Sequence, residues 1–529
     1  MKKINKNFLS IGLIFLFAWS LISCNSVGDD ISKGTTWPPA LPTADKNGVA
    51  TLTGPELLLV PSSVKHILDS NSALRLTIAK EAPKVELAYF EELPSASFNG
   101  TGWSSWGDIC IASDGKVYAG IGNHGGIEEG EAFIYCWDPS TRDLKKIADL
   151  NEITGASPGE VHFSKVHAHI IEGKDKKIYF TGTLDDGGKA GSEPILSKWT
   201  EKIAGGKLFQ YDPATSKNIV YADFPKARVT ATTKYDAERN LLYCALEGDP
   251  AYNDGFALGV FDMNKKEWIY QGVPGQIGMD RNFILDAKGN LYFNGRESFA
   301  HTGVRLKSLL EAWEKDQAKF SKADEGKLIS ASMLPGIKRR LNKEGNKYTT
   351  LWKYDLKTNS VMPTNAYFKS AGFRSDTRET KDGYIYGATM GGELFRYSPS
   401  KDQVDLLGSN FLTDGEYITV CDLSPDEKYL YYLPGAHGSA GFSGTPVIQY
   451  NIEKGEQKAL AFLHEPMNKA FNYAPGGTYG IKVTDDGSTL YVGLNGSPSD
   501  SLRPKELGAG FGLTSFAIIH IPLSERSEK

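Results

Sequence analysis

Seven positions along the chain combine one histidine, three arginines and three aromatic residues. Each lies where a predicted innermost strand begins, counting back from a tyrosine that recurs at a fixed place in a repeated unit. The positions are Trp106, His167, Arg228, Arg281, Arg374, Tyr417 and Tyr479. A guanidinium forms paired hydrogen bonds with a carboxylate or a sulfate, and a flat aromatic face can stack on a pyranose ring. The set therefore predicts a pocket for an anionic sugar.

Further candidates fall in loops expected on the same face. His124 follows the second strand of the first repeat, Tyr252 lies in a loop of the third and His437 in a loop of the sixth. His167 and His169 are two apart on a predicted strand and so point to the same side. Histidine titrates near neutral pH, which suits acid–base catalysis, although each one is also compatible with a hydrogen-bonded structural role.

The elements that position these residues are repeated. A polar turn followed by a short apolar strand with Tyr at one place occurs seven times. The units span 113–120, 174–182, 238–246, 287–295, 381–389, 426–435 and 486–496. In most units a third strand, a turn and an outer strand follow, and a strand-rich period of roughly 40–60 residues predicts a β-propeller. The expected fold is all-β, a seven-bladed propeller over residues 85–524.

The ends of the repeat predict how the ring closes. The seventh unit lacks an outer strand, and an unassigned strand at 85–93 precedes the first unit. We expect this N-terminal strand to complete the last blade, so that no sheet edge is left open. The largest insertion, 296–348 in blade four, has helical apolar spacing. The loops between second and third strands vary and are rich in glycine, as expected of a binding face on a repetitive scaffold.

The repeat also explains residues that would otherwise draw attention. Most tyrosines occupy its fixed positions and are predicted to pack in the core, whereas Tyr252, Tyr417 and Tyr479 do not. Four cysteines fall in predicted strands without metal-ligand spacing and are predicted to be small buried hydrophobic residues. They are Cys110, Cys136, Cys244 and Cys421.

The N-terminal residues predict an export signal. Three lysines within the first six residues precede an apolar run at 8–22 that ends in Leu-Ile-Ser-Cys. The run is short for a spanning helix and is typical of a secretory signal. It resembles the signal of bacterial lipoproteins, which implies that residues 1–23 are removed and that Cys24 carries a lipid.

The rest of the N-terminal region divides by composition. Residues 24–49 are polar and rich in Pro and Gly, as expected of a tether, and 50–84 form an extension without an assigned structure. We expect a lipid-anchored protein of the outer membrane or cell surface. The net charge of -5 provides no field that attracts nucleic acid. The partner expected is an acidic polysaccharide, and we expect a monomer.

Two stretches resemble a known family. Residues 106–126 read WGDICIASDGKVYAGIGNHGG and 165–182 read KVHAHIIEGKDKKIYFTG. They resemble the seven-bladed propeller polysaccharide lyases, in particular the ulvan lyases. The resemblance implies that His124 and His167 are the catalytic histidines and that Arg228 neutralises the carboxylate of a uronic acid.

The chemistry implied is β-elimination. The C5 hydrogen of a uronate becomes acidic only when its carboxylate is neutralised, a role for Arg228 with Arg281 or Arg374. A histidine then removes the proton, and a second histidine or a tyrosine, of which Tyr417 is the candidate, protonates O4 of the departing sugar.

Other classes of function stay open. A glycan-binding surface lipoprotein would use the arginines and aromatic residues without turnover. A metal-dependent glycan-degrading enzyme would use His169, Asp249 and Asp254 as candidate ligands. A glycosidase is also compatible with the scaffold. The lyase requires no cofactor, although a structural calcium or zinc ion is compatible with the sequence.

Overall fold

The computed structural model describes most of the chain from residue 38 onward. The residues described are 38–70, 76–91, 103–123, 125, 130–157, 160–183, 205–225, 229–247, 256–272, 277, 282–295, 349–370, 372–409, 418–435, 439–498 and 512–526. The predicted signal peptide, Cys24 and the insertion at 296–348 lie outside them.

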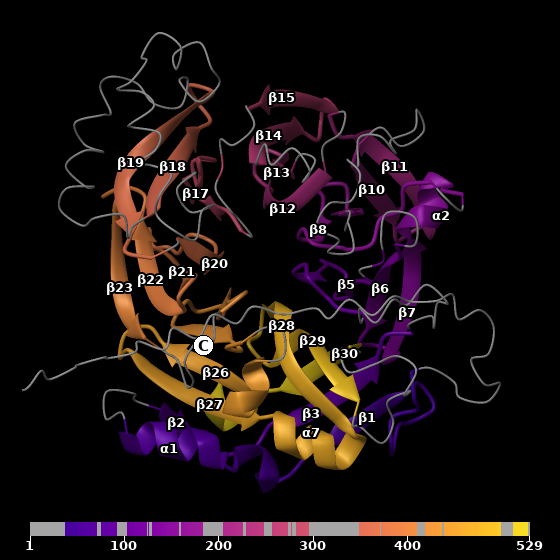
Figure 1. Cartoon of the computed structure of the whole chain (residues 1–529), viewed down its shortest axis with the longest axis vertical. Coiled ribbons are helices and arrows are strands. Elements are labelled where there is room, and N and C mark those ends of the chain that lie inside the picture. Colours follow the sequence, from indigo (N-terminus) through magenta and orange to yellow (C-terminus); the bar gives the residue numbers. More distant parts are fainter. Residues whose placement is uncertain are drawn as a thin grey trace, which may run out of the picture. The chain divides into compact units, whose positions relative to one another are not determined.

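Seven sheets follow one another around a ring (Figure 1). Each is built on antiparallel strands that are consecutive in the chain, and N-terminal strands are added to two of them. The second strands are buried along their whole length, as in Val117–Gly122 and Ile178–Thr181. Successive side chains point to opposite faces of a strand, and both faces pack against neighbouring sheets. The first three blades are β4 (Cys110–Ile111), β5 (Val117–Gly122), β6 (Ala132–Asp138) and β7 (Asp143–Asp149); β8 (Ile171–Glu172), β9 (Ile178–Thr181), β10 (Lys207–Asp212) and β11 (Lys217–Asp223); and β12 (Val229–Asp236), β13 (Leu241–Glu247), β14 (Phe256–Asp262) and β15 (Glu267–Gln271).

The remaining blades continue the pattern. They are β16 (Ile284–Leu285), β17 (Leu291–Asn294), β18 (Thr349–Asp355) and β19 (Ser360–Phe368); β20 (Phe373–Asp376), β21 (Ile385–Thr389), β22 (Glu393–Ser398) and β23 (Gln403–Ser409); β24 (Asp422–Leu423), β25 (Tyr429–Tyr432), β26 (Pro446–Asn451) and β27 (Glu456–Phe462); and β28 (Tyr473–Val483), β29 (Thr489–Pro498) and β30 (Leu513–His520). The chain is therefore a seven-bladed β-propeller, as the repeat predicts.

The recurring tyrosine of the second strand belongs to the core in every blade. The exposed fractions of these side chains do not exceed the 6% of Tyr491. The seven are Tyr118, Tyr179, Tyr243, Tyr292, Tyr386, Tyr431 and Tyr491. Their burial confirms that the repeat, and not a ligand, explains these residues.

The turn between the first and second strands also repeats. Each contains, or ends in, a residue with positive φ, which lets a short polar turn reverse the chain. The positive-φ residues are Gly115, Lys176, Asn240, Gly289, Gly383, Glu427 and Gly487. The first strands are thus held in the same orientation, with their N-terminal ends at one face of the propeller and these turns at the other.

The last blade closes as predicted. Strand β3 (Lys84–Tyr89) pairs antiparallel with β30, with Val85 opposite Ile519. His520 Nε2 also lies 3.0 Å from Glu86 Oε2 across this pair. The N-terminal strand therefore joins a blade whose other strands come from the C-terminal end, and the two ends of the repeat are held together by a sheet.

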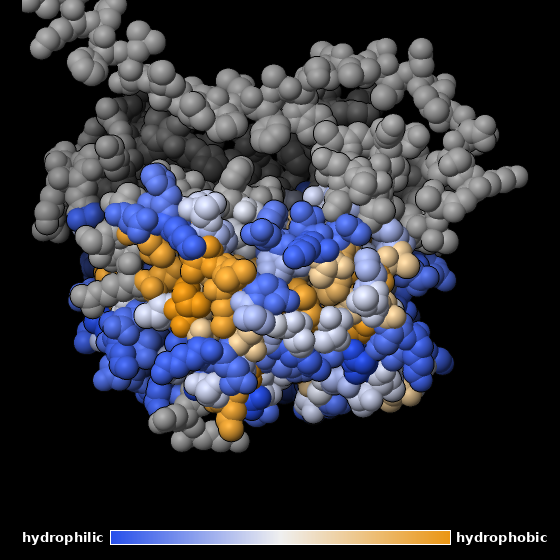
Figure 2. Space-filling model, turned by 90° about the horizontal axis from the view of Figure 1, so that it is seen from below, coloured by the Kyte–Doolittle hydropathy of each residue, from blue (hydrophilic) through white to orange (hydrophobic). Residues whose placement is uncertain are grey.

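The extension at 50–84, to which the sequence assigned no structure, adds outer strands to two blades. Strand β1 (Val49–Leu52) pairs with β3 as a fifth strand of blade seven, and β2 (Leu76–Ile78) runs parallel to β27 as a fifth strand of blade six. Between them lie the 3₁₀ turn η1 (Pro55–Leu58) and helix α1 (Ser62–Ser70). In the view from below, apolar residues show on this side amid hydrophilic ones (Figure 2), and Leu59, after η1, is 69% exposed.

Besides η1 and α1, the described residues form four short helical elements. They are α2 (Leu150–Thr154), α7 (His464–Phe471) and the 3₁₀ turns η5 (Ser439–Ser443) and η8 (Leu523–Glu525). Asp149 caps α2 by accepting hydrogen bonds from the backbone N–H groups of Asn151 and Glu152. Within the described part of the chain, no helix has the length and apolar character needed to cross a bilayer.

The cysteines match their prediction in part. All four in the described residues are free thiols. Cys244 and Cys421 are buried, and desolvation raises the pKa of the Cys421 thiol to about 12. Cys110 and Cys136 are only half-buried, because they lie in the first and third strands with part of the side chain at the surface of the sheet.

Candidate functional site

The N-terminal ends of the innermost strands bring four of the predicted residues together. Trp106 stacks on His167 with ring centroids 5.8 Å apart and an interplanar angle of 17°. Tyr479 lies on another side of the indole, with centroids 4.6 Å apart. Arg374 completes the group, with its guanidinium carbon 5.5 Å from the centre of the Tyr479 ring. We refer to Trp106, His167, Arg374 and Tyr479 as the mouth cluster.

The mouth cluster spans the channel. Trp106 belongs to blade one, His167 to blade two and Tyr479 to blade seven, which are neighbours in the ring. Arg374 comes from blade five and reaches Tyr479 past the intervening blade six. Contact between blades that are not neighbours requires these side chains to meet at the central axis.

The surroundings of the cluster are cationic. Lys165 Nζ lies 5.0 Å from the centre of the Trp106 ring, and a cation over an indole face is attracted by the ring electrons. An Arg374 N–H donates to the carbonyl oxygen of Thr419 at 3.4 Å. His167, Arg374 and Tyr479 are 6%, 5% and 4% exposed, whereas Trp106 is partly exposed. A ligand at this mouth would meet the indole first and two cations beside it.

A set of ionisable residues lies further along the innermost strands. Four of them follow a residue of the mouth cluster by two or three positions, and the fifth, Lys234, comes from blade three. Lys234 Nζ lies 2.7 Å from Asp376 Oδ2, with side chains 17% and 0% exposed. Lys482 Nζ forms a second ion pair with Asp108 Oδ2. We refer to Asp108, His169, Lys234, Asp376 and Lys482 as the channel network.

Asp108, one of the two carboxylates of the network, is also tied to the backbone of two blades. Asp108 Oδ1 accepts hydrogen bonds from the backbone N–H groups of Ile109 at 2.9 Å and Ile481 at 3.2 Å, and so joins blade one to blade seven. Burial raises the pKa of Asp376 to about 6, against the opposing effect of Lys234. Asp376 Oδ1 has no hydrogen-bond partner among the described residues.

His169 lies among the cations of the channel. Burial is the main cause that holds the pKa of His169 well below its usual value, and the charges of Lys234, Lys482 and Arg374 act in the same direction. The imidazole is therefore neutral at physiological pH. The role of His169 as a metal ligand stays a prediction.

The remaining candidates cannot be placed, because they lie outside the described residues. They are His124, Arg228, Tyr252, Asp249, Asp254, Arg281, Tyr417 and His437. In the described part of the chain, no group of three or more His, Cys, Asp or Glu side chains could hold a metal ion.

Sequence reasoning named His169 but missed the four charged members of the channel network. A signal for three of them was present, since a charged residue or histidine follows each mouth residue at a spacing of two or three: Asp108 after Trp106, His169 after His167, Asp376 after Arg374 and Lys482 after Tyr479. Spacing of two on a strand places side chains on one face, and bulges in β20 and β28 change the spacing locally.

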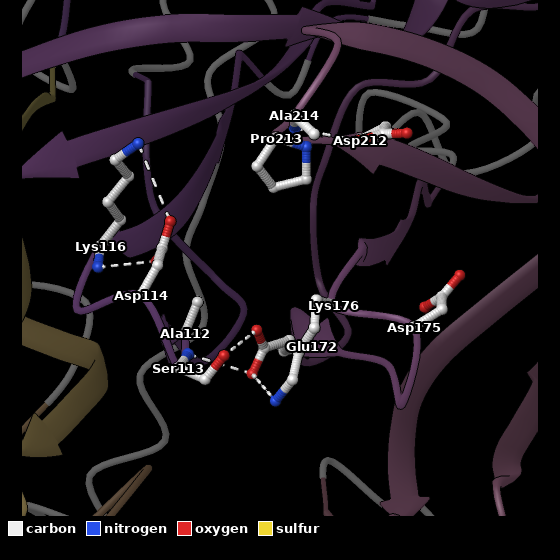
Figure 3. A pocket seen from close by; sticks show the side chains of 10 residues that line it. All are labelled: Ala112, Ser113, Asp114, Lys116, Glu172, Asp175, Lys176, Asp212, Pro213 and Ala214. Atoms are coloured by element: carbon white, nitrogen blue, oxygen red, sulfur yellow. Dashed lines mark hydrogen bonds and ion pairs between the residues drawn. The ribbon is translucent and has the colours of Figure 1, made fainter.

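A separate pocket lies at the other end of the strands. Its cavity volume is about 420 Å³, and turns of blades one and two line it (Figure 3). Glu172 of blade two accepts hydrogen bonds from the backbone N–H and the hydroxyl of Ser113 in blade one, at 3.0 and 2.7 Å. Asp212 and Asp114 accept bonds from backbone N–H groups of their own turns. These carboxylates hold turns and neighbouring blades together, and the pocket does not reach the mouth cluster.

Comparisons with known proteins find solved structures of low similarity. No protein-family model matches the sequence, and no curated protein matches it. Among solved structures, the WD40 repeats of RRP9 give a TM-score of 0.44 at 10% identity, over 84% of this chain and 99% of that one. U3-55K gives 0.43 at 11% identity, over 79% and 95%. Similarity at this level supports no functional argument, and the seven-bladed assignment rests on the strand pairing of this chain.

Proposed function

We propose that the chain is a lipid-anchored lyase of the cell envelope that cleaves a uronate-containing, in some cases sulfated, polysaccharide by β-elimination. The observation that supports this best is the mouth cluster itself. An imidazole stacked on a partly exposed indole, with an arginine against the next aromatic ring, is a combination suited to supply a base, a sugar-stacking surface and a carboxylate partner.

In this mechanism the arginine acts first. The Arg374 guanidinium pairs with the uronate carboxylate and disperses the charge that develops when C5 loses its proton. Arg228 and Arg281 are further candidates for this contact. A preorganised cation in a partly desolvated channel stabilises that charge more than water does.

The histidine then acts as the base. His167 takes the C5 proton, the electrons of the C5–H bond form the C4=C5 double bond, and the C4–O4 bond breaks with its electron pair on O4. His124 or Tyr417 donates a proton to O4, so that the products are an unsaturated uronate and a free hydroxyl. A histidine in reach of C5 suits this role because its ordinary pKa lies near neutral pH.

The experiment is turnover on a broad panel of uronate polysaccharides, followed by the ultraviolet absorbance of the unsaturated product. The His167→Ala variant is expected to lose turnover by about 100-fold or more while it retains glycan affinity. His162→Ala, a half-buried histidine of the same segment, is the matched control and is expected to retain turnover.

The possible results separate the candidate functions. Turnover on no substrate, with glycan affinity present and unchanged in His167→Ala, would replace the lyase with a glycan-binding lipoprotein. Turnover that stops on treatment with a chelator would indicate a metal-dependent enzyme. For the anchor, mass spectrometry of membrane-extracted protein is expected to find acylated Cys24 at the N-terminus, and an unmodified peptide spanning residue 24 would contradict it.

A further inference from the structure

Two asparagines form hydrogen bonds with the backbone next to Trp106 and Arg374, two members of the mouth cluster. Asn495 of β29 accepts a hydrogen bond from the backbone N–H of Ser105 through Oδ1, at 2.8 Å, and donates from Nδ2 to the Ser105 carbonyl oxygen, also at 2.8 Å. Ser105 is fully buried and directly precedes Trp106. The side-chain amide of Asn495 thus forms two hydrogen bonds with the backbone of Ser105, as a residue of a neighbouring strand would, and it joins blade seven to blade one.

Asn294 makes the same pair at another join. Its Oδ1 accepts from the backbone N–H of Phe373 and its Nδ2 donates to the Phe373 carbonyl oxygen, both at 2.9 Å. Asn294 is fully buried at the end of β17 in blade four, and Phe373 directly precedes Arg374 in blade five. The same two-bond contact therefore stands one residue before two members of the mouth cluster.

The backbone next to Phe373 is shaped to receive this amide. Gly372 has φ +104, a conformation that L side chains rarely adopt, and a Cβ at this position would lie 2.2 Å from Asn294 Oδ1. Glycine is needed here both for its conformation and for the space that Asn294 occupies.

Two other joins in the described residues carry a simpler link. Thr183 Oγ1 donates to the Thr230 carbonyl oxygen at 2.7 Å, and Thr445 Oγ1 donates to the Pro475 carbonyl oxygen at 2.7 Å. One hydroxyl bond leaves the accepting peptide free to pivot about it. Two bonds from a planar amide fix both the position and the tilt of the peptide plane, and hence the direction of the next side chain.

We propose that Asn294 and Asn495 are positioning residues that aim Arg374 and Trp106 at the bound sugar, an inference that rests on the proposed function. Asn294 and Asn495 are expected to affect different kinetic constants. Arg374 meets the charge that grows in the transition state, so loss of the Asn294 pair lowers kcat. Trp106 stacks on the sugar in the ground and transition states alike, so loss of the Asn495 pair raises KM.

The test compares Asn294→Ala and Asn495→Ala with Asn290→Ala. Asn290 is also a buried amide of blade four, but it holds the turn at the opposite end, where Nδ2 donates to Asp286 Oδ2 at 2.8 Å. It therefore controls for lost stability. We expect Asn294→Ala to lower kcat about 10- to 100-fold with KM within about threefold. We expect Asn495→Ala to raise KM about tenfold with kcat within about threefold. Asn290→Ala should change neither, when all are assayed well below their unfolding temperatures.

Crystal structures of the two variants give a readout that does not need activity. The Arg374 guanidinium is expected to leave the Tyr479 ring in Asn294→Ala, and the Trp106 indole to leave His167 in Asn495→Ala. Unmoved side chains, or equal kinetic effects in all three variants, would overturn the positioning role. If the side chains are displaced in the two variants but the wild-type protein turns over no uronate, the proposed function is refuted and the geometric assignment stays in place. If a variant fails to fold, Asn294→Asp and Asn495→Asp, which keep one of the two bonds, replace it under the same criteria.

Discussion

Lys234 and Asp376 form an ion pair across the centre of the propeller, with Nζ and Oδ2 2.7 Å apart. They belong to blades three and five, which have blade four between them. The ion pair therefore links blades three and five inside the channel, through side chains of two innermost strands that share no backbone pairing. Because the pair is buried, loss of one charge leaves the other unpaired in a poorly solvated site, whereas water would solvate an unpaired charge at the surface.

Substitution of one partner is expected to lower the free energy of unfolding far more than substitution of both. Asp376→Leu leaves Lys234 charged in a buried site and should lower the free energy of unfolding by about 3–5 kcal/mol. The double variant Lys234→Met with Asp376→Leu should recover most of that loss, because no unpaired charge remains. Urea unfolding of the single and double variants measures the coupling.

The control for this cycle is Lys145 with Asp143. The same atoms are again 2.7 Å apart, but the side chains are 75% and 32% exposed, so solvent screens the pair and no measurable coupling is expected. A coupling free energy between Lys234 and Asp376 as small as that of this surface pair would show that the buried ion pair does not stabilise the fold.

His169 should contribute a loss of stability as the pH drops below about 6.5. Its pKa is held below the usual value in the folded state, so below pH 6.5 the unfolded chain binds a proton that the folded protein does not. Asp376 acts in the opposite sense between about pH 4 and 6, because its pKa is raised and the folded state then binds the extra proton.

The two contributions are separated by substitution. In unfolding measurements from pH 5 to 7, His169→Gln is expected to lose less stability at the acid end than the wild type. His66→Gln, an exposed histidine of α1, should retain the wild-type slope. Parallel curves for the wild type and His169→Gln would show that His169 is not held neutral by the channel.

Gly372→Ala and Gly408→Ala form a matched pair. Their φ angles are +104 and +108, but a Cβ at residue 408 would meet nothing within 4 Å, whereas one at residue 372 would meet the Asn294 amide. Gly408→Ala should cost only backbone strain, about 1–3 kcal/mol. Gly372→Ala should cost more and, because it disturbs the peptide before Arg374, should also reduce turnover. Equal losses of stability in the two variants, measured by thermal unfolding, would show that the Asn294 side chain can move away from the added Cβ without a loss of free energy.

Tyr479 is expected to act through its ring. Its contacts with Trp106 and Arg374 are ring contacts, so Tyr479→Phe should keep glycan affinity and turnover within about threefold of the wild type. Tyr479→Ala should weaken both by about tenfold, since Arg374 loses the surface that it lies on. Titration calorimetry with an oligosaccharide and the elimination assay measure the two effects. A large loss of turnover in Tyr479→Phe with affinity intact would show that the hydroxyl takes part in the chemistry.

The sequence by itself determined the architecture, because a propeller repeats its local rules. Short apolar strands, polar turns and the fixed tyrosine recur along the chain, and the missing outer strand of the seventh unit predicted that the strand at 85–93 closes the ring. The same repeat separated core tyrosines such as Tyr118 from Tyr479, which the structure places at the channel mouth. These signals are local, so they can be read from neighbouring residues alone.

Only the tertiary structure decided which side chains meet. Trp106 and Tyr479 lie more than 350 positions apart in the chain, and their contact depends on ring closure. Lys234 and Asp376 each appear as an isolated charge on an innermost strand, and no local pattern states that one faces the other across the axis. The amides of Asn294 and Asn495 likewise gain their role only from the peptide of the next blade. Contacts across a closed ring depend on strand register and blade tilt together, and these are set by packing of the whole molecule.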